Sequence, residues 1–394
     1  MKKCKNIIKV VMLFAIVLVM GCVEKFEANI GDIPVEGLVV EGDIISDSTV
    51  VFQLSKTLPL NENEEYADLF EDYMNVDAKL QVKGSDGTSW LGFGLGKGQY
   101  RVDIGTLRPD VEYHLEILYD NETYQSKAQL PLATTGIEKL AFSQPDLMGP
   151  VTIFLNTQDS NSDEAEYFLW YYEEDWEIRS DFATTALYHP ELNSIIHYGY
   201  VPVAQGWCYN KNSRIMLGTT EANVKNQIVG KTIQSIKNTD HRLSFLYSIR
   251  VQQRNLTRQE YEYYQVRAKL NNEMGGLFTP QPSELPTNII CSNPSRKVIG
   301  YVGCNMGVSK RQLYIKEEDV CYLDIYRCDM GKDPDGSPRV KYEAGFQISD
   351  VTPIGVEWAR KECVDVRTKN ADPRGRPSWW PNPYKYLTEE QGVE

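Results

Sequence analysis

The sequence has little of what metal sites and nucleotide sites require. Its 394 residues include only four histidines, and these are scattered along the chain. It contains no C-x-x-C pair, no H-E-x-x-H motif, no G-x-S-x-G elbow and no G-x-x-x-x-G-K-[ST] loop. We therefore predict no metal site, no cofactor and no catalytic residue. Each histidine is interpreted as a surface or core side chain: His114, His189, His197 and His241.

The chain also lacks a basic cluster and a second long apolar run. Lys and Arg number 41 against 55 Asp and Glu, a net charge of −14 at pH 7. A surface with this balance repels the phosphates of a nucleic acid. No apolar run after Met20 reaches the ~20 residues that cross a bilayer as a helix. We therefore predict a water-soluble body that does not bind nucleic acid.

The first residues are typical of a secretory signal peptide. A lysine-rich start is followed by the apolar run Val10–Met20, which is too short for a spanning helix. Val19-Met20-Gly21-Cys22 then resembles the bacterial lipobox, in which the cysteine thiol accepts a diacylglyceryl group. We predict a signal peptide over residues 1–21, acylation of Cys22 and a tether over residues 22–33. Two or three acyl chains anchor a protein stably.

This anchor predicts a place in the cell. Loss of the signal peptide removes four lysines and leaves 37 basic against 55 acidic residues, a net charge of −18. Glu24 and Glu27 close to the anchor favour the outer membrane. We expect a lipid-anchored bacterial outer-membrane protein on the periplasmic or the surface face, with the surface favoured.

Six of the eight cysteines remain as candidates for disulfides after Cys4 leaves with the signal peptide and Cys22 is acylated. Six cysteines allow about fifteen connectivities, which the sequence leaves open. If residues 321–328 form one strand, its ends lie about 23 Å apart, beyond the reach of a disulfide. The candidates are Cys208, Cys291, Cys304, Cys321, Cys328 and Cys363.

Residues 34–133 read as six or seven short strands separated by turns, which predicts an immunoglobulin-like or fibronectin-like β-sandwich. Leu107-x-Pro109-x-x-x-Tyr113 resembles the entry to the sixth strand of fibronectin type III domains, where the tyrosine hydroxyl bonds backward at a corner. The glycines between residues 92 and 98 predict a hairpin, not a phosphate loop. The acidic stretch 61–72 is interpreted as a solvated insertion.

A linker at residues 134–136 leads to a larger β-rich domain over residues 137–394. Thr257-Arg-Gln-Glu260 forms a capping box, and Tyr263, Val266 and Leu270 recur at helical spacing. This pattern predicts one prominent α-helix near residues 257–274, packed on a sheet. The predicted fold class is therefore mainly β.

Several motifs together resemble a family of Bacteroidetes lipoproteins named domain of unknown function forty-two forty-nine. They are Cys208, Tyr247–Gln253, the helix with Glu260, Tyr261 and Tyr263, Gly275–Pro282, Asn288-Ile289, Gly300-Tyr301 and Cys363–Pro381. The family often has C-x-D-C near the end, whereas Val366 stands here at the second cysteine. The resemblance therefore puts one disulfide of the family in doubt.

The resemblance implies an accessory role in nutrient uptake. Such proteins are associated with TonB-dependent β-barrel transporters and have no established activity. We expect a non-enzymatic protein that captures a small-molecule, peptide or glycan ligand for such a transporter. Trp170–Tyr172, Trp176, Trp207 and Trp379–Trp380 are mostly expected in the sheet core or at the domain interface, with stacking on sugar rings as the alternative. The alternatives are a surface hydrolase of glycan or peptide, and an adhesive sandwich.

Overall fold

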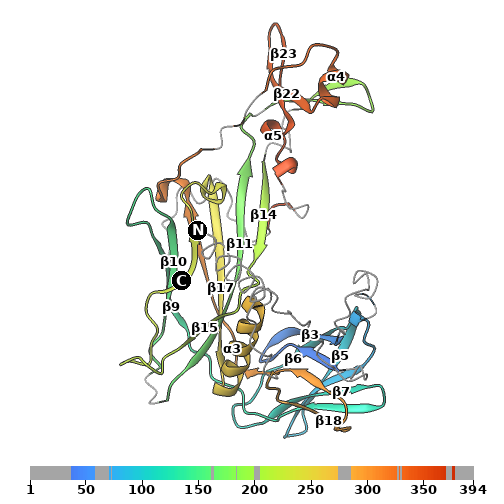
Figure 1. Ribbon diagram of the computed structural model, residues 1–394, viewed down its shortest axis with the longest axis vertical. Helices are drawn as coiled ribbons and strands as arrows, with labels where there is room; N and C mark the ends of the chain where they lie inside the picture. The colour runs from blue at the N-terminus through green and yellow to red at the C-terminus, as the bar shows by residue number, and fades with distance from the viewer. Residues whose placement is uncertain are drawn as a thin grey trace, which may run out of the picture. The chain divides into compact units, whose positions relative to one another are not determined.

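The structure is a computed structural model, and it describes residues 37–57, 71, 73–160, 164–182, 184–198, 205–273, 285–325, 328, 331–369 and 375–377. The predicted signal peptide, Cys22 and the tether lie outside these residues, as does most of the acidic insertion. Within them the fold is mainly β, as predicted (Figure 1). None of the helices described there is long and apolar enough to cross a membrane.

Nine strands form the first sheet, in the order β18-β8-β7-β4-β5-β6-β3-β1-β19. Alternation of buried and exposed residues, clearest in β6, turns one face of this sheet toward its own core. The strands are β1 (Leu38–Glu41), β3 (Ser48–Lys56), β4 (Lys79–Gly84), β5 (Ser89–Gly96), β6 (Gln99–Ile104), β7 (Tyr113–Tyr119), β8 (Glu122–Ser126), β18 (Ile289–Cys291) and β19 (Val298–Gly300). Beside them β2 (Ile44–Ile45) pairs with β20 (Cys304–Asn305).

The two ends of this strand order meet through the side chains of the two residues before β18. The Asn288 amide donates to the Val302 carbonyl at 2.8 Å and accepts from the Val302 amide at 3.0 Å. Thr287 Oγ1 also donates to the Gly300 carbonyl at 2.7 Å. The sheet is therefore nearly closed, where the sequence predicts a sandwich of two sheets.

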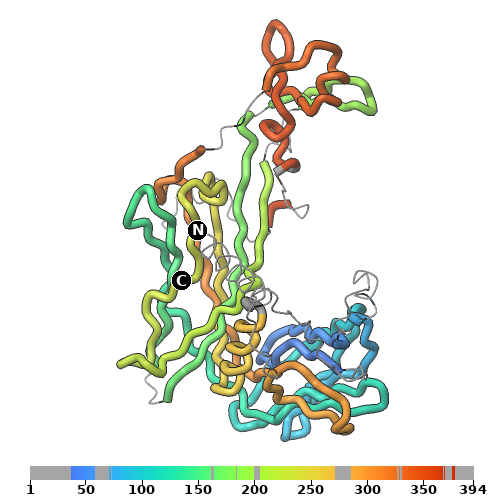
Figure 2. Tube along the Cα trace, in the orientation of Figure 1, coloured from blue at the N-terminus to red at the C-terminus, as the bar shows by residue number. Residues whose placement is uncertain are grey.

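The difference from the predicted sandwich comes from strands distant in sequence. Figure 2 shows the orange trace that contains β18 and β19 beside the blue and teal strands. Residues 289–291 pair with β8, and residues 298–300 pair in parallel with β1. These strands come after residue 137, so the first sheet draws on both sides of the linker.

The predicted tyrosine corner is present. The Tyr113 hydroxyl accepts a hydrogen bond from the Arg108 amide at 2.9 Å, and the Tyr113 ring is buried. The Trp90 ring lies 5.9 Å from it, between centroids. The hydroxyl thus satisfies a backbone group at the turn that leads into β7.

The second part of the fold packs two sheets against each other. Side chains of β10 and β11 share one hydrophobic cluster, in which Ile153, Phe168 and Trp170 are fully buried. One sheet holds β9 (Ile137–Ser143), β10 (Val151–Thr157) and β16 (Lys231–Ile236). The other holds β11 (Tyr167–Arg179), β14 (Gln205–Lys211), β15 (Met216–Thr219), β17 (Leu246–Leu256) and β21 (Ser309–Lys316).

The predicted helix is α3 (Arg258–Glu273). The Thr257 hydroxyl accepts from the Glu260 amide at 3.1 Å, so the predicted cap is confirmed. Tyr263 is buried in a cluster with Leu169 and Leu256, which places the helix against the sheet of β11 and β17. Of the apolar stripe read from the sequence, Tyr263 is core, whereas Val266 and Leu270 are only half-buried.

The last described segment contains short elements. Residues 321–325 have no regular secondary structure. The condition that residues 321–328 form one strand is therefore not met. A small cluster of Tyr188, Ile348 and Trp358 packs the remaining strands together. The elements of the fold not yet given, some of which lie earlier in the chain, are β12 (Ala186–His189), β13 (Ser194–His197), α4 (Pro338–Glu343), β22 (Phe346–Thr352), β23 (Gly355–Arg360), α5 (Lys361–Val364) and the 3-10 helices η2 (His241–Leu243), η3 (Glu317–Asp319) and η4 (Val366–Lys369).

Candidate functional site

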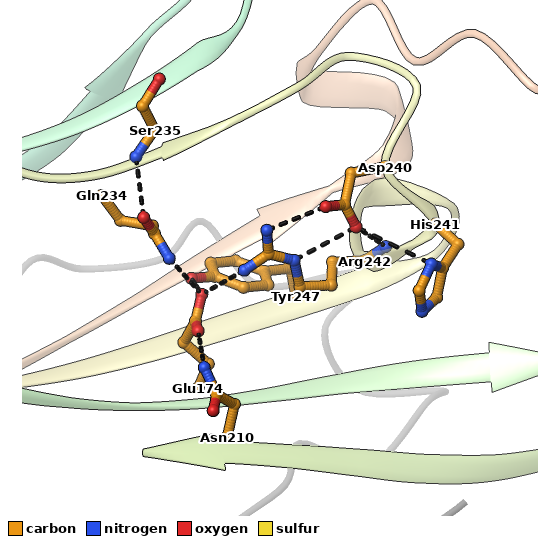
Figure 3. A network of polar contacts seen from close by, with 8 residues as sticks. All are labelled: Glu174, Asn210, Gln234, Ser235, Asp240, His241, Arg242 and Tyr247. Carbon is orange, nitrogen blue, oxygen red and sulfur yellow. Dashed lines mark hydrogen bonds and ion pairs between the residues drawn. The ribbon is translucent and has the colours of Figure 1, made fainter. Parts of the chain in front are cut away.

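A buried carboxylate lies in the middle of the five-stranded sheet that contains β11 and β17, which we call the second sheet. Glu174 lies on β11 opposite Ile249 of β17, and its side chain is fully buried. Its Oε1 accepts from the Tyr247 hydroxyl at 2.6 Å and from Arg242 Nη1 at 2.8 Å. Gln234 Nε2 donates to the same oxygen at 3.2 Å, and Asn210 Nδ2 donates to Oε2 at 2.7 Å. Figure 3 shows these four donors converging on the carboxylate.

Arg242 links this carboxylate to η2. The Asp240 side chain accepts from the Arg242 backbone amide at 3.0 Å, and its Oδ2 accepts from Nη2 at 2.8 Å. Burial raises the pKa of Asp240, but the hydrogen bonds from Arg242 outweigh it and leave the pKa below its ordinary value. Burial alone would lower the pKa of Arg242, yet its bonds to Asp240 and Glu174 raise it. The guanidinium therefore stays charged between two carboxylates.

This network is saturated. A carboxylate offers about four acceptor positions, and Glu174 has four donors. Burial raises the pKa of Tyr247 well above its ordinary value, and the Glu174 charge adds to the rise. Tyr247 therefore stays protonated and donates. The arrangement fixes η2 on the sheet.

A cavity of about 660 Å³ lies next to this network. His241 of η2 is on its wall, and the Trp176 ring lies 6.2 Å from the His241 ring. The wall comes from the end of β11, from η2 and the residue before β17, from the segment after β21 and from the last segment. It consists of Ile178, Arg179, Ser180, Asp181, His241, Ser244, Phe245, Glu317, Tyr322, Asp324, Cys328 and Glu362.

The cavity wall carries more acid than base. Its four carboxylates are Asp181, Glu317, Asp324 and Glu362, whereas Arg179 is its one Arg or Lys among the described residues. Burial and then the nearby Asp324 and Glu317 carboxylates raise the pKa of Tyr322 to about 12. The described wall thus has more carboxylates than basic groups, and one of these carboxylates, Glu362, lies 3.9 Å from Arg360.

An aromatic face in the cavity already binds a cation. The Arg179 guanidinium lies 4.5 Å from the centre of the Phe245 ring and 2.6 Å from the Glu177 carboxylate. Attraction of a cation to a ring face contributes roughly 0.5–2 kcal/mol. The cavity wall thus contains two aromatic side chains, Phe245 and Tyr322, and the guanidinium of Arg179 lies over the Phe245 ring.

One wall of the cavity is held by the disulfide of the structure. Cys328 is bonded to Cys363, with 5.6 Å between the Cα atoms. The Phe182 amide donates to the Cys363 carbonyl at 3.1 Å, which joins α5 to the continuation of β11. The sequence offered both cysteines as candidates without choosing this pair.

The other candidate cysteines lie apart. Cys208 is buried on β14 in a cluster with Ile178 and Val366, so the valine at the family's second cysteine packs against Cys208. Cys291 lies on β18 of the first sheet. Burial raises the pKa of the Cys304 thiol to about 12. Cys321 follows β21 in the chain, and its amide donates to Gln144 Oε1 at 2.7 Å.

The described candidate histidines and aromatic residues do not form one site, and Trp379 and Trp380 lie outside the described residues. His114 is on β7 of the first sheet, as predicted for a strand residue, and His189 and His197 are on β12 and β13. Of the tryptophans, Trp170 is core. Among the described residues no cluster of three or more His, Cys, Asp or Glu is arranged to hold a metal ion. In the sequence, His241 is only one of four scattered histidines. No motif there predicts that Phe245 and Tyr322 share a cavity wall with it.

A second buried ionic cluster joins the two parts of the fold. Arg254 Nη1 on β17 lies 2.7 Å from Glu260 Oε1 of α3 and 3.0 Å from Asp43 Oδ1 of the first sheet. Burial raises the pKa of Glu260 to about 7, and Arg254 only partly offsets it. Asn305 Oδ1 also accepts from Arg254 at 3.3 Å. The cluster fixes the first sheet to β17 and α3.

Comparison with protein families assigns the chain. A family model described as a domain of unknown function, DUF4249, matches residues 23–311. The chain belongs to the DUF4249 family. A comparison with curated proteins found no match. The DUF4249 match covers the first sheet, the three-stranded sheet and the larger part of the five-stranded sheet. It ends within β21, before Glu317, Tyr322, Asp324, Cys328 and Glu362 of the cavity wall.

Proposed function

We propose that this protein is a non-enzymatic, lipid-anchored outer-membrane protein that captures a ligand for a TonB-dependent nutrient transporter. The signal peptide and lipobox of the sequence support the anchor at Cys22. The match to DUF4249 supports the placement among Bacteroidetes lipoproteins. The Tyr113 corner supports a fibronectin-like origin of the first sheet.

The observation that carries the capture role is the cavity beside Arg242. A binding site needs a fixed wall, since ordering a mobile wall costs affinity. The saturated network around Glu174 provides such a wall. The volume of about 660 Å³ lies in the range of small-molecule sites.

The lining favours a ligand with an ammonium or guanidinium group. Its carboxylates outnumber its basic residues, and Phe245 already accepts a guanidinium on its face. A short basic peptide or an organic amine satisfies both features. Titration calorimetry with Lys-containing and Glu-containing peptides of equal length tests this class. We expect a heat of binding for the Lys-containing peptide and none for the Glu-containing peptide. The variants Asp324→Asn and Glu317→Gln should lose the heat of binding of the Lys-containing peptide.

The partnership is tested by purification from gently solubilised outer membranes with an affinity tag on this chain. We expect a β-barrel transporter to accompany the wild type in near-stoichiometric amount and to be lost from Cys22→Ser. Cys321→Ser is the matched control and should retain the barrel. Purification of the acylated chain without any barrel protein contradicts the partnership.

A second candidate function is a hydrolase of glycan or peptide at the cell surface. One observation favours it, namely four carboxylates on the wall of a single cavity. Glycoside hydrolysis uses a pair of such groups. Incubation of the wild type and Asp324→Asn with glycan and peptide libraries distinguishes the two functions. Turnover by the wild type that is lost in the variant supports the hydrolase.

A further inference from the structure

The strand β5 exposes three large apolar side chains. Leu91, Phe93 and Leu95 are 75%, 65% and 49% exposed. The residues between them are Gly92 and Gly94. Isolated exposed apolar residues are ordinary, but three alternating ones along a strand form a continuous stripe.

The packing next to the glycines of β5 is tightest at Gly92. A Cβ on Gly92 would lie 3.0 Å from Leu80 Cδ2 and 3.1 Å from the Leu80 carbonyl oxygen. A Cβ on Gly94 would lie 3.7 Å from the Tyr100 ring, whose hydroxyl donates to the Val76 carbonyl at 2.8 Å. Leu80 thus fills the space next to Gly92, whereas a cavity of about 700 Å³ lies against β5 and is lined in part by Gly92, Gly94 and Tyr100. Leu91, Phe93 and Leu95 are exposed, so a partner outside the sheet can contact them.

A further exposed apolar side chain lies two strands away on β3, with Arg101 of β6 between it and Phe93. Phe93 lies opposite Arg101 of β6, and Arg101 lies opposite Val51 of β3. Val51 is 47% exposed, and the Arg101 guanidinium lies 5.7 Å from the Phe93 ring centre. We call Val51, Leu91, Phe93 and Leu95 the β5 stripe. Figure 1 shows β3, β6 and β5 side by side.

The cations beside the β5 stripe are neutralised. Arg101 lies 3.4 Å from the Asp103 carboxylate, and Lys97 lies 3.0 Å from the Glu71 carboxylate. These pairs leave no excess charge to attract an anionic partner. The surface therefore selects its partner through apolar contact.

The chain enters the first sheet at the end where the β5 stripe finishes. Leu38 of β1 lies opposite Lys56 of β3, three residues beyond Gln53, and Gln53 lies opposite Gln99. The turn at Lys97–Gly98 is at this same end, where the Leu54 amide donates to the Gly98 carbonyl at 2.8 Å. Residues 22–36 can extend at most about 50 Å. The proposed lipid anchor thus keeps this end of the sheet within about 50 Å of the membrane surface.

We propose that the β5 stripe docks on the phospholipid surface in which the acyl chains of Cys22 are anchored. The inference rests on the proposed anchor for its location, and it adds a second contact that orients the body on the membrane. Leucine and phenylalanine side chains enter the interfacial region, while the paired Lys97 and Arg101 remain at its edge.

Flotation with phosphatidylcholine vesicles tests the β5 stripe without the anchor. The mature chain is produced with Cys22→Ser, so that no acyl chain contributes. We expect it to float with the vesicles, and we expect Phe93→Ser to lower the partition coefficient about tenfold, the loss for one large apolar side chain. Phe93→Leu should restore most of the binding. Raising the salt concentration should leave it unchanged, because the local charges are paired.

Ile290→Ser is the matched control. Ile290 is 73% exposed on β18, four strands from β5 in the same sheet, and it should not affect flotation. Equal flotation of wild type and Phe93→Ser, or none by either, overturns the membrane contact. Light scattering that shows a dimer abolished by Phe93→Ser overturns it in favour of a second copy. The acylation and transporter experiments use different readouts, so their failure is distinguishable from this one.

Discussion

Arg254 Nη1 lies 3.0 Å from Asp43 Oδ1, which joins β17 of the second sheet to the loop after β1 in the first. The guanidinium is shared with Glu260 on the other side and is almost fully buried. A buried charge that loses one partner is expensive. The two parts of the fold are thus held together at a point where no hydrophobic pattern predicts contact.

This cluster should make stability depend on pH. The pKa of Glu260 is about 7 in the folded chain against an ordinary 4.5. Between these values the folded state holds a proton that the unfolded state has released. The free energy of unfolding should therefore fall as pH rises from about 4.5 to 7, by up to about 3 kcal/mol from this group.

Chemical denaturation across this pH range checks the prediction. Glu260→Gln should lose that slope, because glutamine does not titrate. Glu262→Gln is a control on the exposed side of the same helix and should keep the slope. Parallel pH profiles for the wild type and Glu260→Gln would contradict the raised pKa.

Removal of Arg242 should destabilise the second sheet. Arg242→Ala leaves the fully buried Glu174 without its cation, and breaking a buried pair in this way costs about 3–5 kcal/mol. Urea denaturation measures the change. The double variant Glu174→Gln/Arg242→Met should recover part of the loss, because no unpaired charge remains. Additive effects of the two substitutions would show that the residues do not interact.

The tyrosine corner should contribute to the first sheet through a single oxygen. Tyr113→Phe keeps the buried ring but leaves the Arg108 amide without its acceptor. We expect a loss of about 1–2 kcal/mol in the free energy of unfolding. Tyr119→Phe at the end of the same strand is the matched control and should change stability little. Equal effects of the two substitutions would contradict the role of the hydroxyl.

The Cys328–Cys363 disulfide should stabilise the wall of the cavity. It closes a loop with a sequence separation of 35, and cross-links of this kind contribute about 2–4 kcal/mol. Cys328→Ser should lower the melting temperature and increase proteolysis near α5. A reducing agent should lower the melting temperature of the wild type to that of Cys328→Ser. It should leave the melting temperature of Cys328→Ser unchanged. Cys321→Ser serves as the control.

Local patterns in the sequence determined much of the fold. Alternation predicted strands such as β6, and the glycine-rich stretch predicted the β5–β6 hairpin. The Thr257 cap and the Tyr113 corner depend on partners within a few residues, so both could be read from the sequence. The choice of sandwich was wrong in detail, because the closing strands lie far along the chain.

The candidate site was decided by tertiary structure alone. Its wall brings His241, Tyr322 and Glu362 together from distant segments, and sequence spacing carries no information about such distances. The pairing of Cys328 with Cys363 is of the same kind, because many connectivities satisfy the sequence and only the fold brings these two within reach. The sequence by itself determined what depends on near neighbours, namely strands, turns and caps. The packing of distant segments decided which charged and aromatic side chains share a cavity.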